Sequence, residues 1–213
     1  MDLRDEAEAY AAADFSEVNA LFVERLLTLC GELEEATGVD LGAGPADIPI
    51  RLARARPRWQ LVAVDAAAAM LELARQGVNA ARLTGAIELR LADATRTDLH
   101  TASCDVVFCN SILHHVADPD ALWREVRRLL RPGGLVLVRD LFRPSSAARA
   151  RELVDLHAGD ESALLQEEFY RSLLAAYTVD EVRAQLELAG LAQLEVELIS
   201  DRHLEVFGRI EAS

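Results

Sequence analysis

The chain has 213 residues, 51% of them hydrophobic, so it can bury one sizeable core and we expect a single domain. Its formal net charge at pH 7 is −14, and its formal positive charge comes from arginine alone because the sequence contains no lysine. A charge of this sign argues against a protein that follows nucleic-acid phosphates or lies on an anionic membrane. It leaves room for a local arginine site that binds a small anion.

The sequence favours the cytoplasm. No stretch approaches the ~20 apolar residues that cross a bilayer, and residues 1–8 lack the basic and apolar regions of a secretion signal. Cys30, Cys104 and Cys109 have no disulfide-framework spacing, so we expect reduced and mostly buried thiols. We expect no metal site, and both a monomer and a homodimer remain open.

Residues 6–35 have the pattern of a helix that ends near Gly31. Its apolar positions recur at helical spacing, at Leu21, Phe22, Leu26, Leu27 and Cys30. A mixed aromatic and polar group precedes them and consists of Tyr10, Asp14, Phe15, Ser16 and Asn19. This group can be a capped helix start or a lid over a ligand, and we assign residues 1–35 to an N-terminal helical lid.

From residue 36 onward, short apolar runs alternate with helix-like segments. The predicted strands are 39–41, 60–65, 87–93, 105–110 and 135–140, and the predicted helices are 48–56, 66–76 and 119–130. Strands that are nearly continuous apolar runs and alternate with helices indicate a parallel sheet covered on both faces. We therefore expect an α/β fold with a Rossmann-like, doubly wound sheet.

The last third of the chain departs from this rhythm. A mostly helical insert is predicted over 145–177, followed by a helix over 178–189 with a capping box at Thr178 and Glu181. Strands over 192–199 and 204–210 form a predicted hairpin, which completes a mostly parallel seven-stranded sheet with an antiparallel C-terminal strand. The expected single domain thus comprises the lid, a cofactor-binding core at 36–143, a substrate cover at 144–177, and the last helix and hairpin at 178–213.

The glycine turn Gly42-Ala43-Gly44 follows the first predicted strand directly. Glycines at such a strand-to-helix turn have no Cβ, so a ligand can approach the backbone closely. Asp47 can cap the helix that follows, and Pro49 would lie in its first turn.

Polar residues stand where the predicted parallel strands end, the edge at which open α/β sheets bind ligands. The set comprises Asp65, Asp93, Asn110, His114, His115, Asp140, Arg143 and the turn at 200–203. Asp65, about 20 residues beyond the glycine turn, suits a ribose diol, and Asp93 can accept from an exocyclic amine. Ala66 and Met70 could pack on a base.

The glycine turn lacks the third glycine of an NAD(P) site, and Asp47 stands in its place. A carboxylate at the start of this helix would repel a pyrophosphate and suits a cofactor with a cationic end. S-adenosylmethionine has such an end, together with a ribose, an adenine and an amino-acid part.

Five segments in order resemble the motifs of class I S-adenosylmethionine-dependent methyltransferases. They are 39–44, 62–65, 91–94, 108–115 and 131–134, within a resemblance that covers about residues 38–142. The segments Leu113-His114-His115 and 131–134 resemble the broad small-molecule branch that includes quinone C-methyltransferases. Ala46 departs from the family, which usually has glycine there.

The resemblance implies roles for the residues of these motifs. Asp40, Gly42, Ala43 and Gly44 would face the methionine end, Asp65 the ribose, Asp93 with Ala94 the adenine, and the Asn110 backbone would help to hold the amino group. The alternative for Asp65 and Asp93 is that they cap the helices that follow them.

The catalytic candidates are His114, His203 and Asp140, because a general base helps when the methyl acceptor carries a proton. His115, Arg143 and Arg202 could contact the acceptor, the two arginines as a grip on an acidic one. Alternatives remain open: the paired histidines can serve packing or capping, and Arg143 can pair with Asp140. Tyr170 belongs to an apolar helical face that either packs on the sheet or forms a substrate lid or dimer surface.

The fourth strand continues as Asn110-Ser-Ile-Leu, which differs from the Asn/Asp-Pro-Pro-Tyr/Phe motif of many N-methyltransferases. Together with the acidic charge, this difference favours transfer to oxygen or carbon of a small molecule. A second hypothesis is a non-catalytic S-adenosylmethionine-binding partner or regulatory protein. The third, an NAD(P) oxidoreductase, is disfavoured by Asp47 and the closing hairpin.

Overall fold

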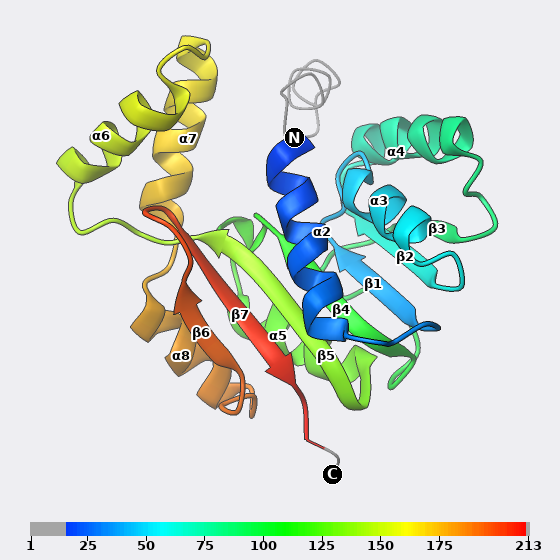
Figure 1. The fold of residues 1–213 in the computed structure, drawn as a ribbon. Helices are drawn as coiled ribbons and strands as arrows, with labels where there is room; N and C mark the ends of the chain where they lie inside the picture. Colours follow the sequence, from blue (N-terminus) through cyan, green and yellow to red (C-terminus); the bar gives the residue numbers. More distant parts are fainter. Residues whose placement is uncertain (1–15, 212–213) are drawn as a thin grey trace.

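A computed structural model gives the arrangement of residues 16–211 as one seven-stranded sheet with helices on both faces (Figure 1). The strands are β1 Thr37–Leu41, β2 Gln60–Asp65, β3 Ile87–Leu91, β4 Cys104–Asn110, β5 Leu130–Leu141, β6 Glu195–Leu198 and β7 His203–Arg209. The helices are α2 Ser16–Cys30, α3 Asp47–Ala55, α4 Ala68–Ala81, α5 Pro119–Leu129, α6 Ala147–Ala158, α7 Ala163–Ala175 and α8 Val179–Leu188, with a short 3₁₀ turn, η1, at Leu113–His115.

The strand order is β3-β2-β1-β4-β5-β7-β6. The first five of these strands are parallel, and β7 runs antiparallel to both β5 and β6. In Figure 1 the arrow of β5 points toward α6 and α7, while that of β7 points the opposite way. The expected doubly wound sheet with an antiparallel C-terminal strand is confirmed. Its order reverses beside β1, so β1 and β4 open the crevice in which such sheets bind ligands.

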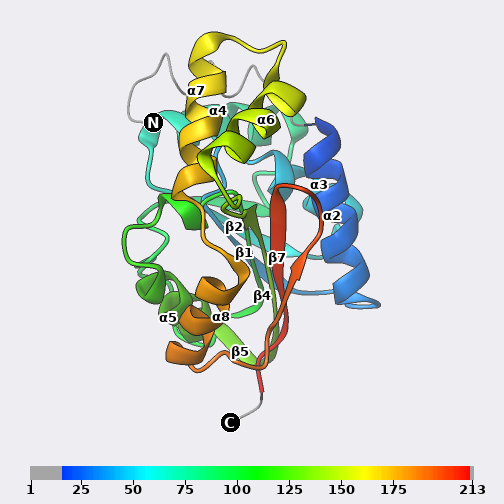
Figure 2. The same ribbon diagram turned by 90° about the vertical axis from the view of Figure 1, so that its left-hand side faces the viewer.

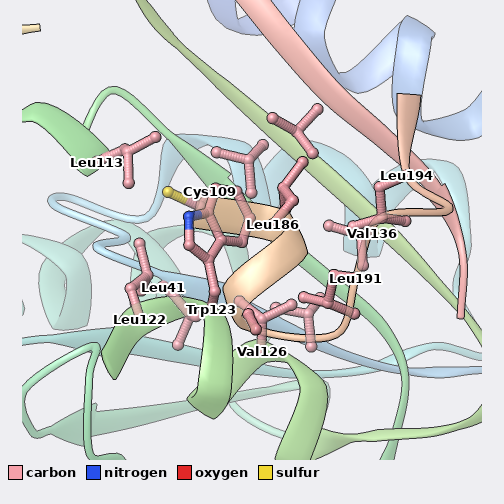
Figure 3. Close-up of a cluster of buried hydrophobic side chains, with 14 of the residues drawn as sticks. Leu41, Cys109, Leu113, Leu122, Trp123, Val126, Val136, Leu186, Leu191 and Leu194 are labelled. Atoms are coloured by element: carbon pink, nitrogen blue, oxygen red, sulfur yellow. The ribbon is translucent and has the colours of Figure 1, made fainter. Parts of the chain in front are cut away.

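Two apolar layers cover the sheet. One contains α2, α3 and α4 and is built around buried side chains such as Trp59, Phe22 and Phe108. The other contains α5 and α8, where Trp123 packs among leucines and valines from both helices and the strands (Figure 3). The indole Nε1 of Trp123 donates a 3.0 Å hydrogen bond to Gln185, which satisfies a polar atom inside this layer.

The insert forms a third, smaller apolar cluster. Ala150, Leu153 and Val154 of α6 pack with Leu173 and Ala176 and with Leu141 at the end of β5. Figure 2 shows α6 and α7 together at one end of the molecule, beyond the carboxyl ends of the parallel strands. The insert therefore stands over the edge at which the sheet would hold a ligand.

Several expected helix ends can be compared with the structure. Thr178 and Glu181 form the predicted capping box at the start of α8. Asp47 does not cap α3: the N-cap is Ala46, with φ of 63° and no side-chain cap, and Asp47 is the first helical residue. The predicted helix before Ser16, with Tyr10, Asp14 and Phe15, lies outside the described residues. No helix within residues 16–211 is long and apolar enough to cross a membrane.

A buried ion cluster fastens α2 to the sheet. Glu205 of β7, 1% exposed, accepts from Arg139 of β5 at 2.6 and 3.0 Å and from Arg25 of α2 at 3.0 Å. The Arg25 guanidinium also lies 4.5 Å from the centre of the Phe207 ring, and that of Arg139 lies 5.3 Å from Phe22. Glu205 thus pairs with two arginines at once, and one of them belongs to α2.

Replacing Glu205 with glutamine should lower the free energy of unfolding by about 3 kcal/mol, because the buried Arg139 guanidinium loses its charged partner. Guanidinium denaturation of the variant measures this loss. Glu195→Gln, on exposed β6, is the matched control and should stay within about 0.5 kcal/mol of the parent. A loss below about 1 kcal/mol for Glu205→Gln would contradict this account of the cluster.

Candidate cofactor and acceptor site

The glycine turn between β1 and α3 is fastened to β2. The backbone N–H groups of Gly42 and Ala43 both donate to the carbonyl of Val64, at 2.8 and 2.9 Å. Gly42 has φ of 80°, and a Cβ there would lie 2.3 Å from Cγ2 of Ile112, so glycine is required on two counts. Around Gly44, φ 52°, a Cβ would meet nothing within 4 Å, so this part of the turn faces open space.

The Asp65 carboxylate joins the glycine turn to the start of α4. Its Oδ2 accepts from the Gly44 N–H and its Oδ1 from the Ala67 N–H, both at 2.8 Å. Asp65 does not cap α4, because the N-cap is Ala67 and no side chain caps this helix; the bond to the Ala67 N–H instead fixes the loop ahead of it. Each oxygen keeps a second lone pair that could accept from a ribose hydroxyl.

Asp40, at the end of β1, is a nearly buried carboxylate without an internal partner. Its exposed fraction is 2%, no hydrogen bond to its side chain occurs within residues 16–211, and its oxygens still reach solvent, because Arg56 Nε is the one fully enclosed side-chain polar atom without a partner among these residues. Burial, and to a smaller degree the charge of Asp65, raises the pKa of Asp40 well above its usual value. Buried polar groups are normally paired, so Asp40 lacks the kind of donor that a ligand amino group would supply.

The remaining residues predicted to contact the cofactor differ in their exposure to solvent. Asp93 is exposed, and its Oδ1 accepts from the N–H and the hydroxyl of Thr95, which lower its pKa, the hydroxyl most. Asn110 and Ala94 are half-buried, whereas Ala66 is exposed. Met70 is 2% exposed, so it offers almost no free surface to a base in this structure.

The charge of Asp47 is less available than the sequence suggested. Its Oδ2 accepts from Nε of Arg51 at 2.6 Å and from the side-chain amide of Asn19 in α2 at 3.0 Å. Because the positive charge of Arg51 offsets the Asp47 carboxylate, Asp47 would repel a pyrophosphate less strongly than the sequence predicted. The pair instead connects α2 to the helix that follows the glycine turn.

His114 and Asp140 form a close pair at the ends of β4 and β5. Nδ1 of His114 lies 2.5 Å from Oδ1 of Asp140, with the two side chains 3% and 1% exposed. Asp140 also accepts from the N–H groups of Leu113 and Leu141, at 2.6 and 2.7 Å. These donors fix the carboxylate, which in turn favours the tautomer whose Nε2 is free to accept a proton.

The other two histidines near the strand ends, His115 and His203, differ from His114 in their surroundings. His115 is exposed, and its ring centre lies 4.0 Å from that of His114. His203 lies beside the β6–β7 turn, 3.1 Å from the Ser200 hydroxyl. Burial, followed by the charge of Arg202, lowers the pKa of His203 to about 4, so it is neutral near pH 7 and a weak base.

The arginines expected to grip an acceptor are already engaged. Arg143 pairs with Glu181, not with Asp140, so the alternative of an Arg143–Asp140 pair is wrong; Asp140 instead accepts from two N–H groups and lies against His114. Arg202 donates to His157 of α6 at 2.7 Å and contacts Asp201 at 3.3 Å. Tyr170 faces Arg151, whose guanidinium lies 3.6 Å from the centre of its ring.

Two residues near the site, Glu181 and Tyr177, have neighbours that were not predicted from the sequence. Glu181 was identified only as a capping residue, yet it also binds Arg143. Tyr177 lies near Asp140, and burial followed by the charge of Glu181 raises its pKa. Only the fold brings these side chains to the end of β5, so no local sequence signal could have assigned them.

Comparison with known proteins agrees with this geometry. A sequence profile of the family described as "Methyltransferase domain" matches residues 39–138. The chain is 34% identical to trans-aconitate 2-methyltransferase of Azoarcus sp. (strain BH72) over 106 residues, 50% of this chain and 39% of that protein. It is 32% identical to malonyl-[acyl-carrier protein] O-methyltransferase of Xylella fastidiosa (strain M23) over 114 residues, 54% of this chain and 37% of that protein. These matches place residues 39–138, a little under half of the chain, in the methyltransferase domain family.

The domain match supports S-adenosylmethionine as the cofactor and gives no support to the NAD(P) alternative. A crystal structure of a SAM-dependent methyltransferase from Aquifex aeolicus has the same fold, with a TM-score of 0.72 and 19% identity over 98% of each chain. The chain spans only about a third of the length of the first curated relatives it matches.

The depressed pKa of His203 predicts a pH-dependent stability. An ordinary histidine titrates near pH 6.5 and His203 at about 4, so between these values the unfolded chain binds more protons than the fold. Stability should therefore fall as the pH drops, by roughly 2 kcal/mol more between pH 7 and 5 than in His203→Asn. Urea denaturation at both pH values measures it, and His100→Asn, at an exposed histidine, should follow the parent. Equal losses in the parent and in His203→Asn would contradict the shift.

Proposed function

We propose that this chain transfers a methyl group from S-adenosylmethionine to oxygen or carbon of a small molecule. The observation that carries the proposal is the nearly buried, unpartnered Asp40 beneath a glycine turn that Asp65 holds open. A cofactor with an ammonium group and a ribose diol matches these two carboxylates better than a pyrophosphate does.

In this proposal the cofactor lies along the carboxyl ends of β1, β2 and β4. Asp40 and the turn Gly42-Ala43-Gly44 hold the amino-acid part, together with the Asn110 backbone. Asp65 accepts from the ribose, and the free Oδ2 of Asp93 accepts from the adenine amine beside Ala94 and Ala66. Met70 would support this base from below rather than face it.

The bound sulfonium supplies an already activated methyl group, so the chain must chiefly align the acceptor, which can contribute ~7–11 kcal/mol. Where the acceptor carries a proton, His114 is the proposed base, with Nε2 receiving the proton and Asp140 orienting the ring through Nδ1. His203 is the weaker candidate because its pKa is about 4. His115 and Tyr170 remain proposed acceptor contacts.

The choice of oxygen or carbon rests on the sequence that follows β4, which lacks the proline pair of many N-methyltransferases. The net charge of −14 supports a small acceptor over nucleic acid. We place the protein in the cytoplasm on its free, buried cysteines at 30, 104 and 109, as a monomer or homodimer.

The second candidate is an S-adenosylmethionine-binding protein without transferase activity. The burial of His114, whose side chain is 3% exposed, favours it, because such a histidine can simply hold η1 against β5. This candidate predicts the same cofactor affinity and no turnover.

Replacing Asp65 with alanine should weaken S-adenosylhomocysteine binding more than tenfold, because both the ribose acceptor and the anchor of the Gly44 N–H are lost. Calorimetric titration measures the dissociation constant. Asp98→Ala, at an exposed aspartate, is the control and should bind as the parent does. Unchanged binding by Asp65→Ala would remove the ribose assignment.

His114→Ala should lower turnover about 100-fold or more and leave cofactor affinity within twofold, because the side chain serves proton transfer and not binding. The assay follows S-adenosylhomocysteine release with an acceptor found by screening. His115→Ala removes the neighbouring imidazole and serves as the comparison. Its turnover should fall far less than that of His114→Ala. Full turnover in His114→Ala would assign the histidine to packing.

A further inference from the structure

The arginines of the chain are distributed unevenly between the two edges of the sheet. Within residues 16–211, five arginines form no ion pair, namely Arg54, Arg56, Arg82, Arg127 and Arg209. They stand at the ends of α3, α4, α5 and β7. Helices that follow parallel strands run back across the sheet, and β7 is antiparallel, so all of these ends lie at the amino edge.

The carboxyl edge, where the proposed site lies, has a different balance. Its arginines are paired with carboxylates: Arg143 with Glu181, Arg202 with Asp201, and Arg51 with Asp47. On the insert, Arg149, Arg151 and Arg171 are paired as well. No arginine of the described carboxyl edge is therefore left over to bind an anion.

Carboxylates at this edge, in contrast, remain without an arginine. The carboxylates of Asp65 and Asp93 accept hydrogen bonds only from backbone or hydroxyl donors, and the side-chain partner of Asp140 is His114. The sulfonium and the ends of the cofactor add one positive charge in total. The local field at the edge is therefore negative, and it opposes an anionic acceptor.

The paired arginines are also held in place. Glu181 accepts from Arg143 while its other oxygen accepts from the Thr178 N–H and hydroxyl, at 2.8 and 3.1 Å. The Thr178 N–H, ahead of Arg143, lowers the pKa of Glu181, which keeps the carboxylate charged. An acidic acceptor that paired with Arg143 would leave the Glu181 carboxylate unpaired and close to its own negative charge.

We infer that the methyl acceptor is uncharged where it meets this edge, such as a phenol or an alcohol, and is not a carboxylate. The inference rests on the proposed function and names its acceptor class. The family match ends at residue 138, before Arg143, Glu181 and Arg202, so relatives similar over the cofactor half do not fix this choice.

The test uses matched probes that differ only in charge. Phenol and benzoate, 2-naphthol and 2-naphthoate, and 4-hydroxybiphenyl and biphenyl-4-carboxylate are titrated at pH 7 into protein saturated with S-adenosylhomocysteine. The phenol of every pair that binds should bind at least tenfold more tightly than the carboxylate. Tighter binding of any carboxylate, or binding of no probe, overturns the inference.

The substitution Glu181→Gln removes the negative charge that pairs with Arg143 while nearly keeping the shape of the side chain. Glutamine also serves at this position of a capping box, so α8 should keep its start while Arg143 loses its charged partner. Carboxylate binding should improve at least tenfold and phenol binding should stay within twofold. Glu187→Gln, at an exposed position of α8, is the control and should change neither. No gain for carboxylates in Glu181→Gln would show that Arg143 does not decide acceptor charge.

Saturation with S-adenosylhomocysteine shows whether a negative result concerns the acceptor class or the proposed cofactor site. Failure of S-adenosylhomocysteine itself to bind would remove the cofactor site and with it the proposed transferase. Normal cofactor binding with a preference for carboxylates would leave the transferase standing and reject only the acceptor class.

Discussion

The Asp65 carboxylate takes one backbone N–H from each of two loops that are more than 20 residues apart in the chain, at Gly44 and Ala67. These two bonds, with the Val64 carbonyl that accepts from Gly42 and Ala43, set the distance between the β1 and β2 loops. The open space around Gly44 and the unpartnered Asp40 depend on that distance. A single side chain therefore shapes the place where a nucleoside and an ammonium group would lie.

Charge pairing decides much of the rest. One buried cluster around Glu205 holds α2 against the sheet. At the carboxyl edge the arginines are matched by carboxylates, whereas the arginines without ion pairs stand at the opposite edge. Alignment of an uncharged acceptor under α6 and α7 is the mode of binding most consistent with this distribution.

The periodicity of the sequence predicted the fold well, because parallel strands buried on both faces are nearly continuous apolar runs and the helices between them are amphipathic. Element ends were less certain: Ala46 adopts a left-handed conformation that the pattern does not reveal, so Asp47 is displaced from the cap. The strand-end rule placed Asp65, Asp140 and His114 at one edge, since parallel strands end together. Side-chain partners could not be predicted in this way, because the Arg143–Glu181 pair depends on how Tyr177, just before α8, pairs with Phe142 and Arg143 beyond the end of β5.

We propose that the glycine turn and the carboxylates of β1 and β2 bind S-adenosylmethionine. Calorimetric titration of the purified chain with S-adenosylmethionine, S-adenosylhomocysteine and NADH measures this binding. We expect micromolar binding of both sulfur nucleosides, one per chain, and no binding of NADH. Binding of NADH, or of neither sulfur nucleoside, would contradict it.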